Sequence, residues 1–183
     1  MHAWMASVFG DDTAKNAGRV TLNPLKHLDV FGTLLIFIAG IGWAKPVPVN
    51  SSYFATRRIQ SIIVSLVGPL SNFVLAFIGF SIIYFLPVNH SFESFLNIFV
   101  SLNVVLGVFN LLPLPPLDGY RIISNLFPTK MQMKLRPLET YGSIVFLVVM
   151  LTPIGDHTIL PFISNSIGIV INSFYSFYEL FLS

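Results

Sequence analysis

A single carboxylate, Asp118, follows three prolines at the end of a long apolar run, in the stretch NLLPLPPLDGYR of residues 110–121. Ionisable side chains at membrane depth are costly in free energy and are usually functional. Because prolines exclude a continuing regular helix, we expect an extended or kinked backbone that holds the carboxylate at a fixed point. A carboxylate held in this way suits a metal site or a proton relay. A turn at the end of a helix, where Asp-Gly is common, explains the same residues equally well.

A second polar side chain, Asn72, lies within the string GPLSN of residues 68–72, in the middle of an apolar segment. The proline of this string frees a backbone carbonyl and kinks the helix. Polar residues inside a membrane span usually face the interior of the helix bundle. An interhelical hydrogen bond is therefore the simplest role for Asn72, and a functional role stays open beside it.

Other polar residues indicate less. We expect His27 to order a loop rather than to bind a metal, and we expect His90 and His157 to be solvated. Aspartate side chains bond to their own backbone in turns, which is the role expected near the N-terminus. The aspartates concerned are Asp11, Asp12 and Asp29.

The composition is that of an integral membrane protein. Of the 183 residues, 54% are hydrophobic and 10% are charged, whereas soluble domains average roughly 25% charged residues. There is no cysteine, which excludes a disulfide framework and thiol chemistry. We therefore expect residues 1–183 to form a single membrane-embedded domain, with the lipid bilayer and membrane proteins, not nucleic acid, as partners.

The apolar pattern predicts an all-α, polytopic fold with about four full transmembrane helices after residue 57. A span needs about 20 apolar residues. The four expected spans are residues 59–86, 95–112, 138–151 and 159–182.

The first 58 residues are more irregular. Residues 1–9 are typical of the end of a helix, with Gly10 as the residue that terminates it. The alternation and β-branching within residues 18–22 predict a short strand, and the Pro-Val alternation of residues 45–50 predicts an edge strand. Residues 30–43 are apolar but too short to span, so a re-entrant segment beside a β-hairpin is expected there.

The distribution of cations predicts the orientation. All ten Lys and Arg residues lie within residues 15–58 or 121–136. Positively charged loops remain in the cytoplasm, so the basic loops 15–26, 45–58 and 121–136 should be cytoplasmic. The loops 87–93 and 153–158 carry no Lys or Arg and should lie on the other side. Asp118 then lies at the cytoplasmic end of its span.

Several strings, in order along the chain, resemble the site-2 protease family of intramembrane zinc metalloproteases, in its compact bacterial branch without a PDZ domain. The similarity covers the chain to about residue 137, and the shared order of several motifs makes it specific. The strings are HAW (2–4), GDDTAKNAGRVTLNPLKHLD (10–29), GWAKPVPVN (42–50), GPLSN (68–72) and NLLPLPPLDG (110–119).

In that family a transmembrane helix carries HExxH, whose two histidines bind zinc and whose glutamate is the general base, and an LDG aspartate is the third ligand. The resemblance implies that His2 is the second histidine, that Asp118 is the carboxylate ligand, and that Asn72 lies on the substrate side of the site. The first histidine and the glutamate correspond to positions before Met1. We therefore expect the sequence to begin inside the motif, and the chain by itself to be inactive.

Three functions follow as hypotheses. The first is a Zn²⁺-dependent endopeptidase that cuts in or near the transmembrane segments of other proteins, in a bacterial cytoplasmic membrane with the active site toward the cytoplasm. The second is a non-proteolytic relative that binds such segments. The third is a small transporter, because broken helices and polar groups inside spans also suit a substrate pathway.

Overall fold

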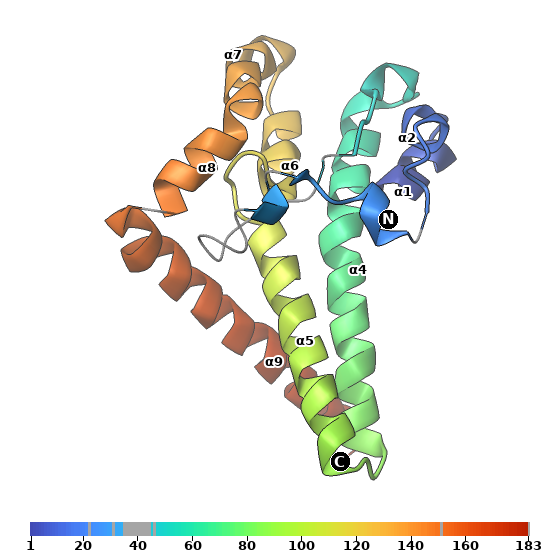
Figure 1. The fold of residues 1–183 in the computed structure, drawn as a ribbon, viewed down its shortest axis with the longest axis vertical. Coiled ribbons are helices and arrows are strands. Elements are labelled where there is room, and N and C mark those ends of the chain that lie inside the picture. The colour runs from blue at the N-terminus through green and yellow to red at the C-terminus, as the bar shows by residue number, and fades with distance from the viewer. Residues whose placement is uncertain (22, 31, 35–44, 46, 151, 183) are drawn as a thin grey trace. The chain divides into compact units, whose positions relative to one another are not determined.

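The computed structural model describes residues 1–21, 23–30, 32–34, 45, 47–150 and 152–182. They form two compact units, Met1–Val64 and Ser65–Ser183, which are described separately (Figure 1). The described residues form helices and turns, with Leu28 as an isolated bridge residue. The predicted all-α fold is thus confirmed. The expected re-entrant segment lies mostly outside the described residues.

The first unit begins with two short helices, α1 (His2–Val8) and α2 (Thr13–Asn16), followed by the 3-10 turns η1 (Pro24–Lys26) and η2 (Ser51–Tyr53). Gly10 ends α1 with a φ of 92°, as predicted, and Gly18 follows α2 with a φ of 65°. Each glycine adopts the left-handed conformation that commonly terminates a helix. Each of the two short helices therefore ends in a turn within the first 20 residues.

The expected hairpin strand at residues 18–22 is not present in the described part of the chain. The backbone N–H of Arg19 bonds to the carbonyl of Ala14 and thus caps α2. The buried Arg19 side chain donates to the carbonyl oxygens of Lys26 and Lys45, the latter at 2.6 Å. These segments are therefore held together by one guanidinium group, where a hairpin would use a ladder of backbone hydrogen bonds.

Asp11 is the second buried charged residue of this unit and is fully inaccessible to solvent. Its carboxylate accepts hydrogen bonds from the backbone N–H groups of Thr13, at 3.0 Å, and Asn50, at 2.6 Å. Burial raises the pKa of Asp11, but the bonds from Thr13 and Asn50 outweigh burial and leave the pKa below the ordinary value of 3.8. The predicted turn former therefore also joins two segments that lie 39 residues apart.

The second unit is built on long helices, α4 (Arg57–Phe85), α5 (His90–Asn110) and α9 (Leu160–Leu182), and the boundary between the units falls within α4. Among the described residues, three helices are long and apolar enough to cross a membrane. They correspond to the first, second and fourth predicted spans. The helix α5 starts five residues before the expected position because the Asn89 side chain caps it by accepting from the N–H of Phe92.

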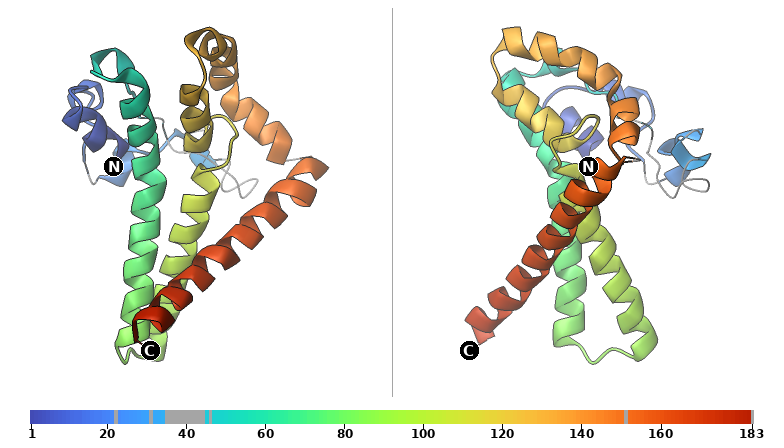
Figure 2. Two further views of the ribbon diagram at one scale, coloured as in Figure 1. Left: turned by 180° about the vertical axis from the view of Figure 1, so that it is seen from behind. Right: turned by 90° about the vertical axis from the view of Figure 1, so that its left-hand side faces the viewer.

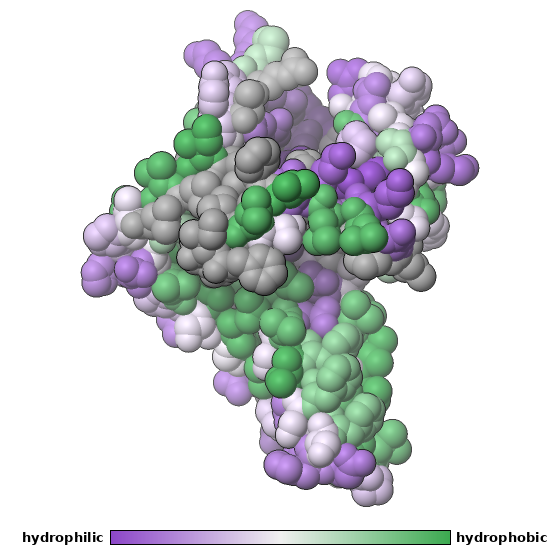
Figure 3. All heavy atoms as spheres, in the orientation of Figure 1, coloured by the Kyte–Doolittle hydropathy of each residue, from purple (hydrophilic) through white to green (hydrophobic). Residues whose placement is uncertain are grey.

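The surface of these helices is apolar. Large hydrophobic side chains such as Leu75, Ile78, Ile98 and Leu102 are exposed on α4 and α5. The lower part of Figure 3 shows apolar residues along both helices and a polar tip at the connection between them. An apolar surface of this extent is expected where a protein contacts lipid.

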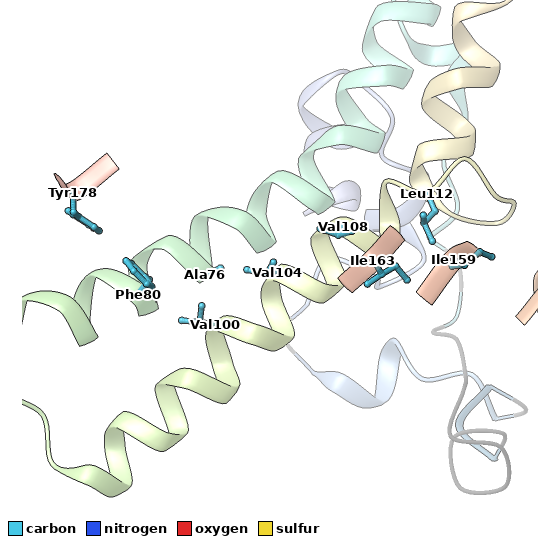
Figure 4. Packing of buried hydrophobic residues seen from close by; sticks show 9 residues of the cluster. All are labelled: Ala76, Phe80, Val100, Val104, Val108, Leu112, Ile159, Ile163 and Tyr178. Carbon is cyan, nitrogen blue, oxygen red and sulfur yellow. The ribbon is translucent and has the colours of Figure 1, made fainter. Parts of the chain in front are cut away.

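A stripe along α5 forms the core of the second unit. Val100, Val104 and Val108 recur every four residues and so share one face of the helix. Glycine lets α4 approach α5 closely, since a Cβ at Gly107 on α5 would lie 2.7 Å from the ring of Phe73 on α4. Figure 4 shows the stripe with its partners on the other helices, and Figure 2 shows α9 crossing α5 obliquely.

The direction of α9 follows from its contacts. Ile159, in the π-helical turn η3 (Gly155–Ile159), and Ile163 pack in the cluster that contains Val108 and Leu112 at the end of α5. At its other end, Tyr178 stacks on Tyr84 near the end of α4, with ring centroids 4.7 Å apart. The helix α9 therefore starts beside the end of α5 and ends near the connection between α4 and α5.

The third predicted span, residues 138–151, is different in the structure. The polar residues before it form α6 (Asp118–Leu126) and α7 (Thr129–Thr140), and only the nine residues of α8 (Gly142–Met150) are apolar helix. Nine residues extend about 14 Å, less than the hydrocarbon thickness. The ring of Phe146 on α8 packs edge-on against Phe109, so α8 stays beside the end of α5.

This arrangement corrects the predicted side of the loop 153–158. A tight turn, with the N–H of Gly155 bonded to the carbonyl of Thr152 at 2.9 Å, joins α8 to α9. The loop therefore lies at the same end of the second unit as Asp118, and not at the end where α4 meets α5. The prediction failed because it counted α8 as a full span.

Topology can be measured by labelling single cysteines. Cysteines placed at His90 and Glu179 are expected to react from the same side of the membrane, because α9 ends near the connection between α4 and α5. A cysteine at Asn125, on α6, should react from the opposite side. Labelling of the Glu179 and Asn125 positions from one side would show that a fourth segment crosses the membrane.

The bonds of Asp11 predict an acid-sensitive first unit. Because the pKa of folded Asp11 is lowered, its contribution to stability is complete above pH 3.8 and is lost as the pH falls below this value. Asp11→Asn should lower the unfolding free energy at pH 7 by about 2 kcal/mol, the typical value of hydrogen bonds to a charged group. Thermal unfolding in detergent between about pH 7 and pH 3 measures both effects. A variant that kept the full pH dependence would contradict this role.

Candidate metal centre

His2 lies at the start of α1 and is half-buried. Its Nδ1 is 2.7 Å from the backbone carbonyl oxygen of Val64. A carbonyl oxygen can only accept, so the imidazole Nδ1 carries the proton and donates it. The lone pair of the neutral ring is then on Nε2. This is the state in which histidine binds a metal through Nε2 while a carbonyl orients the ring.

An open cavity of about 700 Å³ lies beside His2 in the first unit. Its walls are mostly apolar, with Trp4, Val20 and Val47 among the lining residues, and Arg19 and His27 also contribute. The two segments that Arg19 joins therefore form part of the wall. The cavity can accept an apolar side chain next to the His2 imidazole.

Asp118 lies in the second unit, as the first residue of α6, and is half-buried. The helix α5 ends at Asn110, and the backbone then forms a turn in which the N–H of Leu117 bonds to the carbonyl of Leu114 at 2.9 Å. The peptide bond between Pro115 and Pro116 is cis. The prolines thus end the regular helix, as predicted. The carboxylate lies where the dipole of α6 favours a negative charge.

Two glycines hold this segment against its neighbours. A Cβ at Gly119 would lie 2.1 Å from the carbonyl oxygen of Leu111 and 2.5 Å from that of Leu112. A Cβ at Gly142, the first residue of α8, would lie 2.9 Å from the Cβ of Pro115. No side chain fits at such distances. The position of Asp118 is therefore set by direct contact between the end of α5 and the start of α6.

Tyr120, two residues after Asp118, fixes α6 from its other side. The buried hydroxyl donates to the carbonyl oxygen of Leu135 on α7 at 2.9 Å. Burial raises the pKa of the Tyr120 hydroxyl, and the nearby Glu139 carboxylate adds to the increase. The hydroxyl therefore stays protonated and keeps donating.

Asn72 lies on α4 and is half-buried. The structure shows no hydrogen bond from its amide to another described residue, so the interhelical bond that we expected is not formed among them. Asn103 on α5, another polar residue expected inside a span, bonds within its own helix, to the carbonyl of Phe99.

The other candidates have structural or solvated positions. His27 donates from Nε2 to the carbonyl oxygen of Thr21 at 2.9 Å, which confirms that it orders a loop. His90 and His157 are exposed, as predicted. Asp29 accepts from the N–H of Gly32, as expected of a turn former.

The described residues contain no group of three or more His, Cys, Asp or Glu side chains that could hold a metal ion. His2 belongs to the first unit and Asp118 to the second. Each donor nevertheless suits zinc, which binds imidazole nitrogen and carboxylate oxygen. His2 also has the carbonyl partner that zinc-binding histidines usually have. The donor chemistry therefore fits zinc as far as these two residues define it.

Sequence reasoning missed the contacts that position these donors. The motif indicated Gly119 only as part of a turn, whereas its role is to let two helix ends touch. The role of the Val64 carbonyl could not be predicted from the sequence, because the backbone carbonyl group is the same in every residue.

Comparison with known proteins also indicates a zinc-dependent peptidase. The model of the family described as "Peptidase family M50" matches residues 87–152. The chain is 46% identical over 190 residues to "Putative zinc metalloprotease YwhC" of Bacillus subtilis, a match that covers 97% of this chain and 85% of that protein.

Two mycobacterial proteins are more distant. The chain is 34% identical over 159 residues to "Putative zinc metalloprotease Rip2" of Mycolicibacterium smegmatis and 30% identical to the protein of the same name of Mycobacterium tuberculosis. Each match covers 83% of this chain and 61% of the relative. The chain therefore spans less than two thirds of the mycobacterial relatives. No solved structure matches it.

The contact at Gly119 predicts a large effect of one methyl group. Gly119→Ala should lower the unfolding free energy by about 1–3 kcal/mol or more, because α6 must move away from α5. Gly168→Ala, on α9, is the matched control, since a Cβ there meets no atom within 4 Å and alanine favours a helix by up to about 1 kcal/mol. Thermal unfolding in detergent compares the two. Equal stability of both variants would show that the contact has no such role.

Proposed function

The chain belongs to peptidase family M50, the site-2 protease family, and we propose that it provides His2 and Asp118 to the zinc site of an intramembrane endopeptidase. The substrates proposed are membrane proteins, cut in or near a transmembrane segment. The observation that carries the proposal is the hydrogen bond of His2 to Val64, which puts the proton on Nδ1 and so makes Nε2 the nitrogen that can bind a metal. The three apolar helices support a location in the membrane.

His2 and Asp118 have complementary roles in the proposal. His2 binds through Nε2, with its ring orientation held by the carbonyl of Val64. Asp118 adds an anionic oxygen from the start of α6, where Gly119 and Tyr120 hold the helix in place. When bound, zinc lowers the pKa of water and polarises the scissile carbonyl.

The family pattern assigns two further groups, a histidine and a glutamate, to the turn of helix before His2. We propose that hydrolysis needs both of these groups in addition to His2 and Asp118. A non-proteolytic relative that binds transmembrane segments is the second candidate function. Restoring the two residues separates the candidates.

The substrate is proposed to bind as an apolar segment. The cavity next to His2 has mostly apolar walls, which suits side chains from a membrane span. Asn72 is assigned to the substrate, because its amide has no partner among the described residues and could bond to a peptide backbone. Apolar walls with few polar groups are typical of a site that fixes orientation through those groups.

The proposed location is a bacterial cytoplasmic membrane, with the zinc site toward the cytoplasm. The Lys and Arg residues of α6 and α7 lie at the Asp118 end of the second unit, whereas the connection between α4 and α5 has none. This asymmetry is the one that the positive-inside rule relates to orientation. The relatives compared above are also bacterial.

Rescue of activity tests the proposal. A chain extended upstream by an apolar helix that ends in His, Glu and one further residue before Met1 should bind zinc and cleave a model transmembrane substrate in detergent. The added histidine then lies one helical turn before His2 on the same face, and the added glutamate can act as general base. The chain of 183 residues should hold zinc weakly and show no cleavage.

Two variants of the extended protein distinguish the assigned roles. Asp118→Asn keeps the size but removes the negative charge, so zinc content and activity should fall together, by about 100-fold in activity. Asn72→Ala should lower activity and leave zinc bound. Full zinc content and cleavage with asparagine at position 118 would exclude Asp118 as a ligand.

A further inference from the structure

We propose that the backbone carbonyl of Val64 and the small side chain of Ala6 position His2 by selecting its tautomer before any metal binds. The inference rests on the proposed function at one point, which is that His2 binds a metal through Nε2. Val64 and Ala6 touch neither metal nor substrate and act through His2.

The packing of α1 brings His2 to a main-chain group. His2 and Ala6 are four residues apart and share one face of the helix. Ala6 is fully buried in a cluster with Phe54 and Val64 at the start of α4. Because alanine has only a methyl group, the backbones approach closely enough for the imidazole to reach the carbonyl of Val64 at 2.7 Å.

A carbonyl is a selective partner for a neutral histidine. Either ring nitrogen of neutral imidazole can carry the proton. A carbonyl oxygen accepts and cannot donate, so it favours the tautomer protonated on Nδ1. A hydrogen bond of ordinary net strength shifts such an equilibrium by about fivefold. The Nε2 lone pair is thus present in most molecules before a metal arrives.

His27 provides a contrast within the same cavity wall. Its Nε2 donates to the carbonyl oxygen of Thr21 at 2.9 Å, so its proton is on the other nitrogen. Two histidines that line one cavity therefore have opposite tautomers. Of these two histidines, His2 has its lone pair on Nε2, the nitrogen farther from the backbone.

The first experiment measures the tautomers of the chain of 183 residues, without added metal. Nitrogen-15 NMR of histidine-labelled protein in detergent, at about pH 8 where imidazole is neutral, distinguishes protonated from unprotonated ring nitrogens. Signals are assigned with His2→Gln and His27→Gln. The expected result is the Nδ1–H form for His2 and the Nε2–H form for His27, with averaged signals for the exposed His90 and His157.

The second experiment alters the packing between Ala6 and Val64. Ala6→Leu should move α1 away from Val64 and reduce the tautomer ratio of His2 about fivefold, while His27 keeps its signature. Ala17→Leu, at an exposed position, is the matched control and should change neither histidine. The unchanged signature of His27 also reports that the first unit is still folded.

A backbone substitution keeps the test valid if Ala6→Leu does not fold. Replacing Ser65 by the α-hydroxy analogue of valine turns the carbonyl of Val64 into an ester carbonyl, which is a weaker acceptor. Ser65→Val is its matched control, because it has the same side chain and an ordinary amide. The ratio for His2 should fall in the ester protein relative to Ser65→Val.

The outcomes separate this inference from the proposed function. An Nε2–H form or an even mixture at His2 in the unaltered chain would overturn the inference, as would an ester protein with the same ratio as Ser65→Val. A selected Nδ1–H form supports it, whether or not the extended protein binds zinc. Failure of zinc binding in the extended protein would instead overturn the proposed function alone.

Discussion

The close contact between the end of α5 and the start of α6 is the constraint on which the second unit depends. The backbone of Gly119 lies so near the carbonyls of Leu111 and Leu112 that no Cβ fits between them. Asp118 precedes Gly119 by one residue, so this contact also fixes the position of the Asp118 carboxylate. Gly142 brings α8 equally close to Pro115. A chain of main-chain contacts thus positions the one acidic group of this segment.

In the first unit, buried charged side chains hold segments of the chain together. Asp11 joins the start of α2 to Asn50, and Arg19 joins the loops at Lys26 and Lys45. Such groups are tolerated in the interior because each has several hydrogen-bond partners. The result is a compact unit made of very short helices, in which α1 presents His2 beside an open cavity. A backbone carbonyl accepts a hydrogen bond from His2 and another accepts from His27.

A membrane location explains why the second unit has a small buried core and an apolar exterior. Its core is a narrow stripe on α5, while large apolar residues cover the outside of α4 and α5. In lipid this exterior costs nothing, and packing between helices depends on close approach at small residues, as at Gly107. The short α8 then fits, because it lies beside the end of α5 where a polar connection and a tight turn adjoin it.

The sequence by itself determined the class of the protein and its chemistry. Composition identified a membrane protein, apolar length identified α4, α5 and α9, and the order of motifs identified the family and predicts its donors, His2 and Asp118. These properties are local, since each depends on residue type and on spacing along the chain. The cap at Gly10 and the loop role of His27 were predictable for the same reason.

Only the tertiary structure decided how the donors are held. It showed that α8 is too short to cross, that Arg19 replaces a hairpin, and that Gly119 marks a contact between helices. It also showed the bond of His2 to Val64, across 62 residues of sequence. Interactions of this kind join backbone groups or residues far apart in the chain, and the backbone of every residue carries the same carbonyl. The spacing of residues along the sequence therefore does not predict which backbone carbonyl a given side chain will contact in the folded protein.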